Sequence, residues 1–163
     1  MREGEALKKI KSSPGYPSYK RFIKGPVAVI ECPEEIPCDP CSETCPFNAI
    51  EVGKPITNLP RLIEDRCTGC GLCITACPGL AIFVVNLNYS TEEASISMPY
   101  EFLPVPKVGE QVKVLNREGA HICEGRVIKV DEGKDHTRVV TIAVPKKFFE
   151  VARGIRLSPD VVK

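Results

Sequence analysis

CTGCGLCITACP, at residues 67–78, carries four cysteines in the order C-x2-C-x2-C-x3-C-P. Three thiolates on so tight a loop can reach three irons of one cubane cluster, and the fourth cysteine follows on a predicted helix. Gly69 and Gly71 allow the backbone to curl around such a cluster and to turn N–H groups toward its sulfurs. The spacing therefore predicts a [4Fe–4S] site.

A second run, CDPCSETCP at residues 38–46, repeats the later part of the first. The separation is constant at 32 residues, from Cys38 to Cys70, from Cys41 to Cys73 and from Cys45 to Cys77. This constant separation indicates an internal duplication. Glu35 occupies the position equivalent to Cys67, and Cys32 stands three residues earlier. A three-residue insertion in the first loop accounts for the shift.

From about residue 28 to residue 85 the chain resembles the bacterial two-cluster ferredoxin fold. The resemblance rests on the two cysteine runs and covers about a third of the chain. It implies a pseudo-twofold pair of β units, two short helices and two [4Fe–4S] clusters with exchanged fourth ligands. The implied ligands are Cys32, Cys38, Cys41 and Cys77 for cluster 1, and Cys67, Cys70, Cys73 and Cys45 for cluster 2.

Zinc is the main alternative for these cysteines. Zinc modules usually pair C-x2-C knuckles that lie far apart, and a three-cysteine run ending in x3-C-P suits one tetrahedral ion poorly. Cys123 stands alone, and we expect it to be a small buried apolar side chain. His121 and His136 lie near predicted turns and are expected to be ordinary surface histidines.

The composition limits the classes of protein that remain. The chain has 163 residues, and 22 Lys and Arg nearly balance 21 Asp and Glu. No stretch approaches the roughly 18 apolar residues that would span a bilayer, and no apolar run follows the start to form a signal peptide. We therefore expect a cytoplasmic protein with no membrane span. In that reducing compartment nine cysteines favour metal binding over disulfides.

The predicted fold class is α+β, a ferredoxin-like two-cluster domain with a second small antiparallel β domain that is barrel-like. Four regions are expected: a basic N-terminal arm (1–27), the 2×[4Fe–4S] ferredoxin domain (28–88), a proline-marked linker (89–106) and the small β domain (107–163). The charge supports this division, because residues 1–30 carry a net +5 and residues 31–80 a net −5.

Local patterns predict the elements of the outer regions. Turn formers make the arm read as extended, followed by a strand at 27–30. Apolar and polar residues alternate at 112–115 and 126–130, and an apolar run covers 139–144, which indicates a small antiparallel sheet. Residues 146–153 are expected to form a short helix that ends before a glycine.

The sequence contains no Gly-rich dinucleotide loop, no nucleophile–base pair and no hydrolase metal motif. The expected role is therefore electron transfer without catalysis. The chain plan resembles small iron–sulfur subunits of multisubunit oxidoreductases, which implies a larger flavin- or cofactor-bearing dehydrogenase as partner. One alternative is a stand-alone soluble ferredoxin. The other is a nucleic-acid-linked iron–sulfur protein, which the near-neutral charge of residues 81–163 disfavours.

Overall fold

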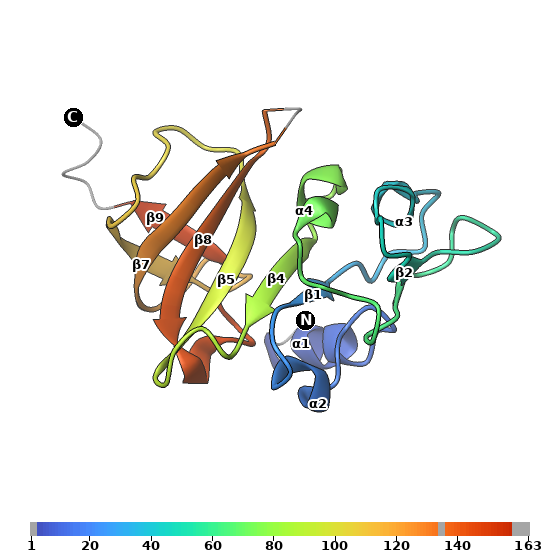
Figure 1. Cartoon of the computed structure of the whole chain (residues 1–163), viewed down its shortest axis with the longest axis horizontal. Helices are drawn as coiled ribbons and strands as arrows, with labels where there is room; N and C mark the ends of the chain where they lie inside the picture. The colour runs from blue at the N-terminus through green and yellow to red at the C-terminus, as the bar shows by residue number, and fades with distance from the viewer. Residues whose placement is uncertain (1–2, 134–135, 158–163) are drawn as a thin grey trace.

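Over residues 3–133 and 136–157, which it describes, the computed structural model has an antiparallel sheet of seven strands (Figure 1). Their order across the sheet is β1-β4-β5-β8-β7-β6-β9. The strands are β1 (Val27–Ile30), β4 (Ile82–Asn86), β5 (Glu93–Tyr100), β6 (Gln111–Leu115), β7 (His121–Glu132), β8 (Arg138–Pro145) and β9 (Gly154–Leu157). The sheet thus extends from the strand before the first cysteine to the C-terminal part of the chain.

The hydrophobic core follows the middle of this sheet. β5 alternates half-buried and buried side chains, and Ala94, Ile96 and Met98 are on its buried face. β8 lies between β5 and β7, and its residues 139–144 are all buried. Ile96 and Ile142 are paired residues across the β5–β8 ladder and both are fully buried. Burial of each such side chain contributes about 1.5–3 kcal/mol.

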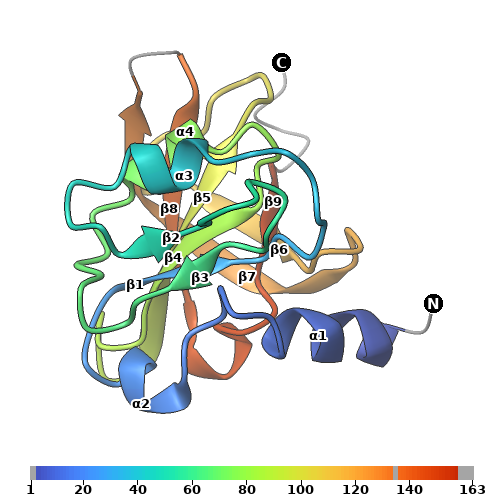
Figure 2. The same ribbon diagram turned by 90° about the vertical axis from the view of Figure 1, so that its right-hand side faces the viewer.

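The cysteine-rich region folds into two similar halves (Figure 2). α3 (Pro40–Glu43) packs against α4 (Leu72–Ala76), and β2 (Ile50–Glu51) pairs with β3 (Arg61–Leu62). Asn48 and Leu80 are 32 residues apart and have the same left-handed backbone, with φ of 49° and 51°. The sequence duplication is therefore also a duplication of backbone conformation.

The N-terminal region is ordered, so its prediction as an extended arm was wrong. It forms α1 (Glu3–Lys11) and α2 (Tyr19–Phe22), and the ring of Phe22 is only 2% exposed. Phe22 makes edge-to-face contacts with Tyr16 and Phe149, with ring centroids 5.9 Å and 5.1 Å apart. These aromatic side chains pack onto the core of the same chain, and this packing stabilises the folded N-terminal region. The composition of the region did not indicate such packing.

The predicted linker at 89–106 was wrong where β5 lies. β5 pairs with β4 through residues 95–97 and with β8 along its whole length. Pro99 suggested a break in the strand, but β4 pairs with β5 only through residues 95–97. Pro99 lies past this pairing, so its missing N–H costs no hydrogen bond to β4. The sheet is therefore continuous across the expected boundary between the two domains.

The strands expected at 27–30, 112–115, 126–130 and 139–144 are confirmed by β1, β6, β7 and β8. The helix expected at 146–153 was wrong beyond its first turn: the chain forms the 3-10 turn η1 (Lys146–Phe148), and Gly154 begins β9 instead of ending a helix.

Within the described ranges no helix has the length and apolar character needed to cross a membrane. The class of a ferredoxin-like domain with a barrel-like β domain stays a prediction.

Candidate metal centre

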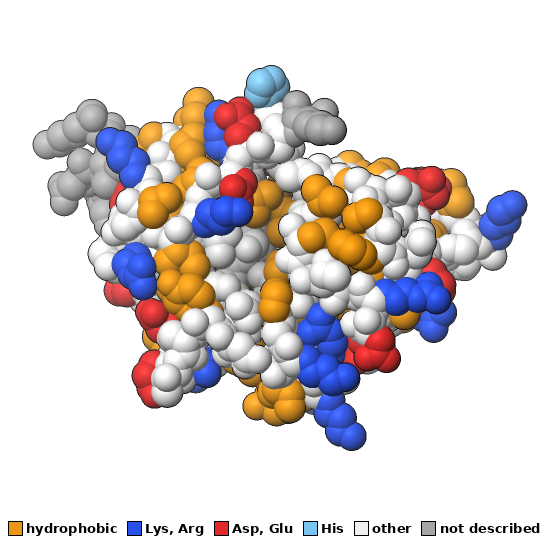
Figure 3. All heavy atoms as spheres, in the orientation of Figure 1, with side chains coloured by type: hydrophobic (Ala, Val, Ile, Leu, Met, Phe, Trp, Pro, Cys, Tyr) orange, Lys and Arg blue, Asp and Glu red, His pale blue; other side chains and the backbone are white. Residues whose placement is uncertain are grey.

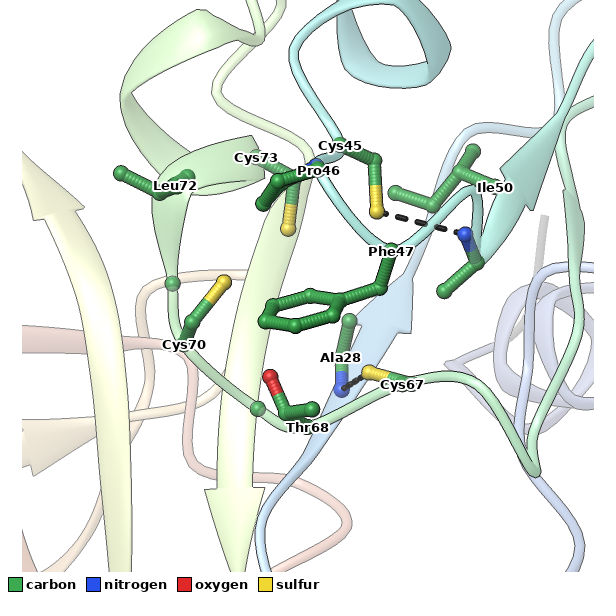
Figure 4. Close-up of a pocket in the computed structure, with 13 residues that line it drawn as sticks. Ala28, Cys45, Pro46, Phe47, Ile50, Cys67, Thr68, Cys70, Leu72 and Cys73 are labelled. Atoms are coloured by element: carbon green, nitrogen blue, oxygen red, sulfur yellow. Dashed lines mark hydrogen bonds between the residues drawn. The ribbon is translucent and has the colours of Figure 1, made fainter.

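Four cysteines line one pocket beside α4 (Figure 4). Three come from the loop that leads into α4 and from its first turn, and the fourth follows α3 in the other half of the repeat. These residues are Cys67, Cys70, Cys73 and Cys45. In Figure 4 their sulfur atoms face a common space, and the ring of Phe47 lies across it.

A second pocket is lined by the four remaining cysteines of the two runs. Three come from the first half of the repeat, and the fourth directly follows α4. These residues are Cys32, Cys38, Cys41 and Cys77. Ile30, Ile36 and Ile82 also line it, and Glu34 and Asn58 are its polar lining residues.

The structure therefore brings together two groups of four cysteines, and each group takes its fourth member from the other half of the repeat. These are the two sets named from the sequence, although their role as ligands stays a prediction. Within the described residues, no group of three or more His, Cys, Asp or Glu is placed to hold one metal ion.

Backbone N–H groups already point at three of the cysteine sulfurs. Ala49 N donates to Cys45 Sγ at 3.3 Å, and its counterpart 32 residues later, Ala81 N, donates to Cys77 Sγ at 3.5 Å. A third bond joins the N–H of residue 28 in β1 to the sulfur of residue 67 at 3.4 Å. Such donors stabilise thiolate and cluster negative charge, so the two sites fit an anionic iron–sulfur group.

Burial makes free thiolates unfavourable at both sites. It raises the pKa of Cys41 to about 11, and the nearby thiol of Cys77 adds to the rise. The pKa of Cys73 is raised further by stronger burial and by the adjacent thiols of Cys67 and Cys70. A bound cation offsets both effects, because a thiol that coordinates a metal loses its proton. The two groups of cysteines are therefore chemically suited to a bound metal cation.

The two pockets differ in their exposure to solvent. Cys70 is exposed, whereas each cysteine of the second pocket is buried or half-buried. Leu72, two residues later, is 50% exposed, and Figure 3 shows hydrophobic side chains gathered at the surface over α4. A groove of about 770 Å³ separates the Cys70 loop from β5, β7 and β8. The first pocket is thus the one that another molecule can approach through an open groove.

Cys123 and the two histidines lie outside both cysteine pockets. Cys123 is half-buried in β7 and packs against the core, so the prediction of a buried apolar side chain was only partly right. His121 and His136 are exposed and interact with nearby glutamates. The expectation of ordinary surface histidines is consistent with these positions.

Sequence reasoning missed two buried arginines near the cysteine loops. Arg21 is 7% exposed and Arg153 is 9% exposed, although Lys and Arg are seldom buried. In the sequence Arg21 is only one of several basic residues of the N-terminal region. Arg153 follows the apolar pair VA at 151–152, which is too short a pattern to indicate burial. No local signal would have identified either residue.

Comparison with known proteins agrees with this geometry. Residues 36–81 match the family model of the 4Fe-4S dicluster domain. Protein Pixie of Drosophila melanogaster is 28% identical and translation initiation factor RLI1 of Saccharomyces cerevisiae 25%, each over 72% of this chain and 21% of the relative. A selenate reductase subunit of Mesobacillus selenatarsenatis is 32% identical over 68% of this chain and 37% of the relative.

The chain spans 21% of the length of each of the first two relatives and 37% of the length of the third. No solved structure matches it. The family match and these relatives identify the cysteine-rich region as a 4Fe–4S dicluster domain of the ferredoxin type. The chain therefore contains an iron–sulfur domain and is similar to proteins that include a subunit of an oxidoreductase.

Proposed function

We propose that this chain holds two [4Fe–4S] clusters and relays electrons between them as a subunit of a larger oxidoreductase. The observation that carries the proposal is the arrangement of eight cysteines in two groups of four with exchanged fourth members. Cluster 1 is assigned to Cys32, Cys38, Cys41 and Cys77, and cluster 2 to Cys67, Cys70, Cys73 and Cys45.

The exchange of ligands keeps the two clusters close together. Cys73 lies in α4 and belongs to cluster 2, whereas Cys77 directly follows this helix and belongs to cluster 1. Four residues of helix correspond to a rise of about 6 Å. Cys41 and Cys45 make the same connection through α3 in the other half. Two such short separations favour rapid electron transfer between the clusters.

Protein purified and kept under anaerobic conditions should contain about eight irons and eight acid-labile sulfides per chain, as two cubanes require. Iron and sulfide are measured against protein determined by amino-acid analysis, and zinc is measured in the same samples. About four irons per chain would reduce the proposal to one cluster. Zinc in place of iron would refute it.

The partner is proposed to be a larger flavin- or cofactor-bearing subunit, which supplies the chemistry that this chain lacks. One related protein is by name a subunit of selenate reductase, and another is the polyferredoxin-like subunit of an aliphatic sulfonate oxidoreductase. The exposed Cys70 loop and its groove offer such a partner access to cluster 2. Free cysteines and oxygen-sensitive clusters suit the reducing cytoplasm, where we propose that the protein works.

Isolation of the native complex tests the subunit role. Affinity capture of the tagged chain from its source under anaerobic conditions should recover a larger subunit that contains flavin or another redox cofactor, in a fixed ratio. Size-exclusion chromatography with native mass spectrometry gives that ratio. A monomer that reduces a small artificial acceptor at full rate without any partner would support the stand-alone ferredoxin instead.

A second candidate function is a role linked to translation. It is favoured by the similarity to Pixie and RLI1, which extends over 72% of the chain, well beyond the cysteine runs. The same capture experiment separates the two candidates. Ribosomal subunits in the captured fraction, lost on raising the salt concentration, would support the translation role; a cofactor-bearing subunit without ribosomal protein would support the oxidoreductase.

A further inference from the structure

The leading cysteine of each group lies farther along the chain from the short helices α3 and α4 than the other cysteines do. Cys67 lies at the start of the loop that leads into α4, and Cys32 lies two residues after the end of β1. Neither is held by helix hydrogen bonds of its own. Each, however, is connected to a buried arginine that comes from outside the dicluster domain, one on the N-terminal side and one on the C-terminal side.

Arg21 in α2 holds the segment around Cys67. Its guanidinium donates to the carbonyl oxygen of Cys67 at 2.6 Å and to that of Pro26 at 2.8 Å. It also donates to the carbonyls of Glu64 and Gly25, at 2.9 Å and 3.1 Å. Through these four carbonyl oxygens the arginine joins two segments of the chain, residues 25–26 and residues 64–67.

A second contact fixes the position of Arg21 itself. Ser18, at the N-terminus of α2, donates its N–H and its hydroxyl to the carboxylate of Glu64, at 2.5 Å and 2.9 Å. Phe22, the next residue in α2, is buried in the core. The Arg21 guanidinium therefore has little freedom to move away from Cys67.

Arg153 acts on the other group through Glu31, the residue before Cys32. Glu31 is only 2% exposed, and its Oε1 accepts from Arg153 Nε at 2.6 Å. Its other oxygen, Oε2, accepts from the guanidinium of Arg117. Arg153 also donates to the carbonyl of Phe149 and lies over the ring of Phe83, 5.1 Å from its centroid.

The backbone of Glu31 extends this connection to a second ligand of the same group. Glu31 N donates to Ala81 O at 2.8 Å, and Ala81 N donates to Cys77 Sγ at 3.5 Å. Glu31 is therefore next to Cys32 in the chain, and Ala81 links it to Cys77 through two hydrogen bonds. A buried carboxylate at this point needs a buried cation beside it. Arg153 supplies that cation, because its side chain is 3% exposed whereas that of Arg117 is 39% exposed.

We propose that Arg21 and Arg153 are positioning residues for different clusters: Arg21 fixes Cys67 for cluster 2, and Arg153, through Glu31, fixes Cys32 and Cys77 for cluster 1. The inference rests on the proposed two-cluster function. It gives the segments before and after the dicluster domain a role in holding cluster ligands. The N-terminal segment and the C-terminal strands each hold the ligands of one cluster in place.

If the two arginines only contributed to overall folding, their replacement would have a different result from the one that this assignment predicts. Loss of overall stability would weaken both clusters together, whereas loss of one positioning residue weakens one. Replacement of a residue that orients metal ligands typically costs 10–100-fold in metal affinity. The two arginines act at separate sites, so each variant is a matched control for the other.

The test uses Arg21→Met and Arg153→Met in the full chain with both clusters. Iron release to the chelator bathophenanthroline is followed anaerobically, and the thiols freed at half release are alkylated and identified by peptide mass spectrometry. Arg21→Met is expected to accelerate release about 10–100-fold from one cluster, freeing Cys45, Cys67, Cys70 and Cys73 first. Arg153→Met should accelerate release by a similar factor from the other, freeing Cys32, Cys38, Cys41 and Cys77 first.

Three further variants separate positioning from charge and from folding. Arg21→Lys and Arg153→Lys keep the charge but lose the fork of donors, and each should release iron at an intermediate rate from the same cluster as its methionine variant. Arg61→Met removes an exposed arginine that pairs with Glu51 and should match the original chain at both clusters. If a methionine variant does not fold, its lysine variant gives the same comparison.

The reduction potential is a readout that a purely structural role would not shift. The hydrogen-bond partners that the structure describes for the Arg21 guanidinium are carbonyl oxygens, so its positive charge can stabilise the reduced state of cluster 2. Arg21→Met should lower the potential of cluster 2 in an EPR-monitored titration, and Arg21→Lys should restore most of it. The charge of Arg153 is shared with Glu31, so its replacement is expected to shift cluster 1 less.

The inference fails if both methionine variants free all eight cysteines in parallel, or if each frees the group assigned to the other. It also fails if both keep both clusters at the original rate. These results are distinct from failure of the proposed function, which would show as fewer than about eight irons in the unaltered chain before any variant is made.

Discussion

A Gly69→Ala chain is expected to lose cluster 2 while it keeps cluster 1. Gly69 has a φ of +70°, which costs a residue with a side chain roughly 1–2 kcal/mol. The added Cβ would also lie 2.6 Å from Pro26 Cβ, 2.7 Å from Pro26 C and 2.8 Å from Pro26 O. The backbone of Pro26 is held by Arg21, so the loop between Cys67 and Cys70 must move instead.

Iron analysis and EPR of the reduced protein measure this result. Iron should fall from about eight to about four per chain, as loss of one cubane requires. Gly119→Ala is the control, because Gly119 has a φ of +83° but no atom within 4 Å of the added Cβ. It should cost about 1 kcal/mol of unfolding free energy and keep both clusters. Full iron in Gly69→Ala would show that the close contact with Pro26 is not required.

Replacing Cys45 by serine is expected to remove the cluster whose other ligands lie more than twenty residues later in the chain. Cys45 belongs by sequence to the first cysteine run, yet its sulfur shares a pocket with Cys67, Cys70 and Cys73. Without the fourth thiolate this site loses cluster 2 or keeps an incomplete one. The iron content should fall toward about four per chain, a loss as large as that from the glycine variant.

Alkylation of the folded Cys45→Ser protein identifies the affected site. The thiols of Cys67, Cys70 and Cys73 should react, whereas Cys38 and Cys41 stay protected by cluster 1. Cys123→Ser serves as the control, because Cys123 lies outside both pockets, and it should keep about eight irons. Reaction of Cys38 and Cys41 in the Cys45 variant would mean that each run binds its own cluster and that the assignment of fourth ligands is wrong.

The cysteine groups could be predicted from the sequence because cluster ligation is encoded in short spacings. Three residues of one loop, such as Cys67, Cys70 and Cys73, are brought together by the local chain path alone. The exchange of Cys45 and Cys77 followed from the resemblance to two-cluster ferredoxins, and the pockets group these residues in the same way. The alternating strands near the C-terminus were equally local and were predicted with similar accuracy.

The features that sequence reasoning missed depend on contacts between distant residues. The Arg153–Glu31 ion pair joins residues 122 positions apart, and Arg21 reaches Cys67 across 46. A buried arginine and an exposed one look alike in a sequence, so the basic N-terminal region resembles an unattached arm. β5 was missed because Pro99 suggested a break, although proline is tolerated where a strand has no neighbour on that side.

The continuous sheet bears on how an electron donor or acceptor would approach the two proposed clusters. If a flexible tether joined the two parts of the chain, a partner held by the C-terminal strands would sample many distances from cluster 2, and transfer would wait for a favourable encounter. β5 is instead hydrogen-bonded to β4 on one side and to β8 on the other. The strands on both sides of the expected domain boundary therefore belong to one hydrogen-bonded sheet. A redox partner that bound the outer strands would be held in one orientation relative to β4 and the strand that precedes the first cysteine.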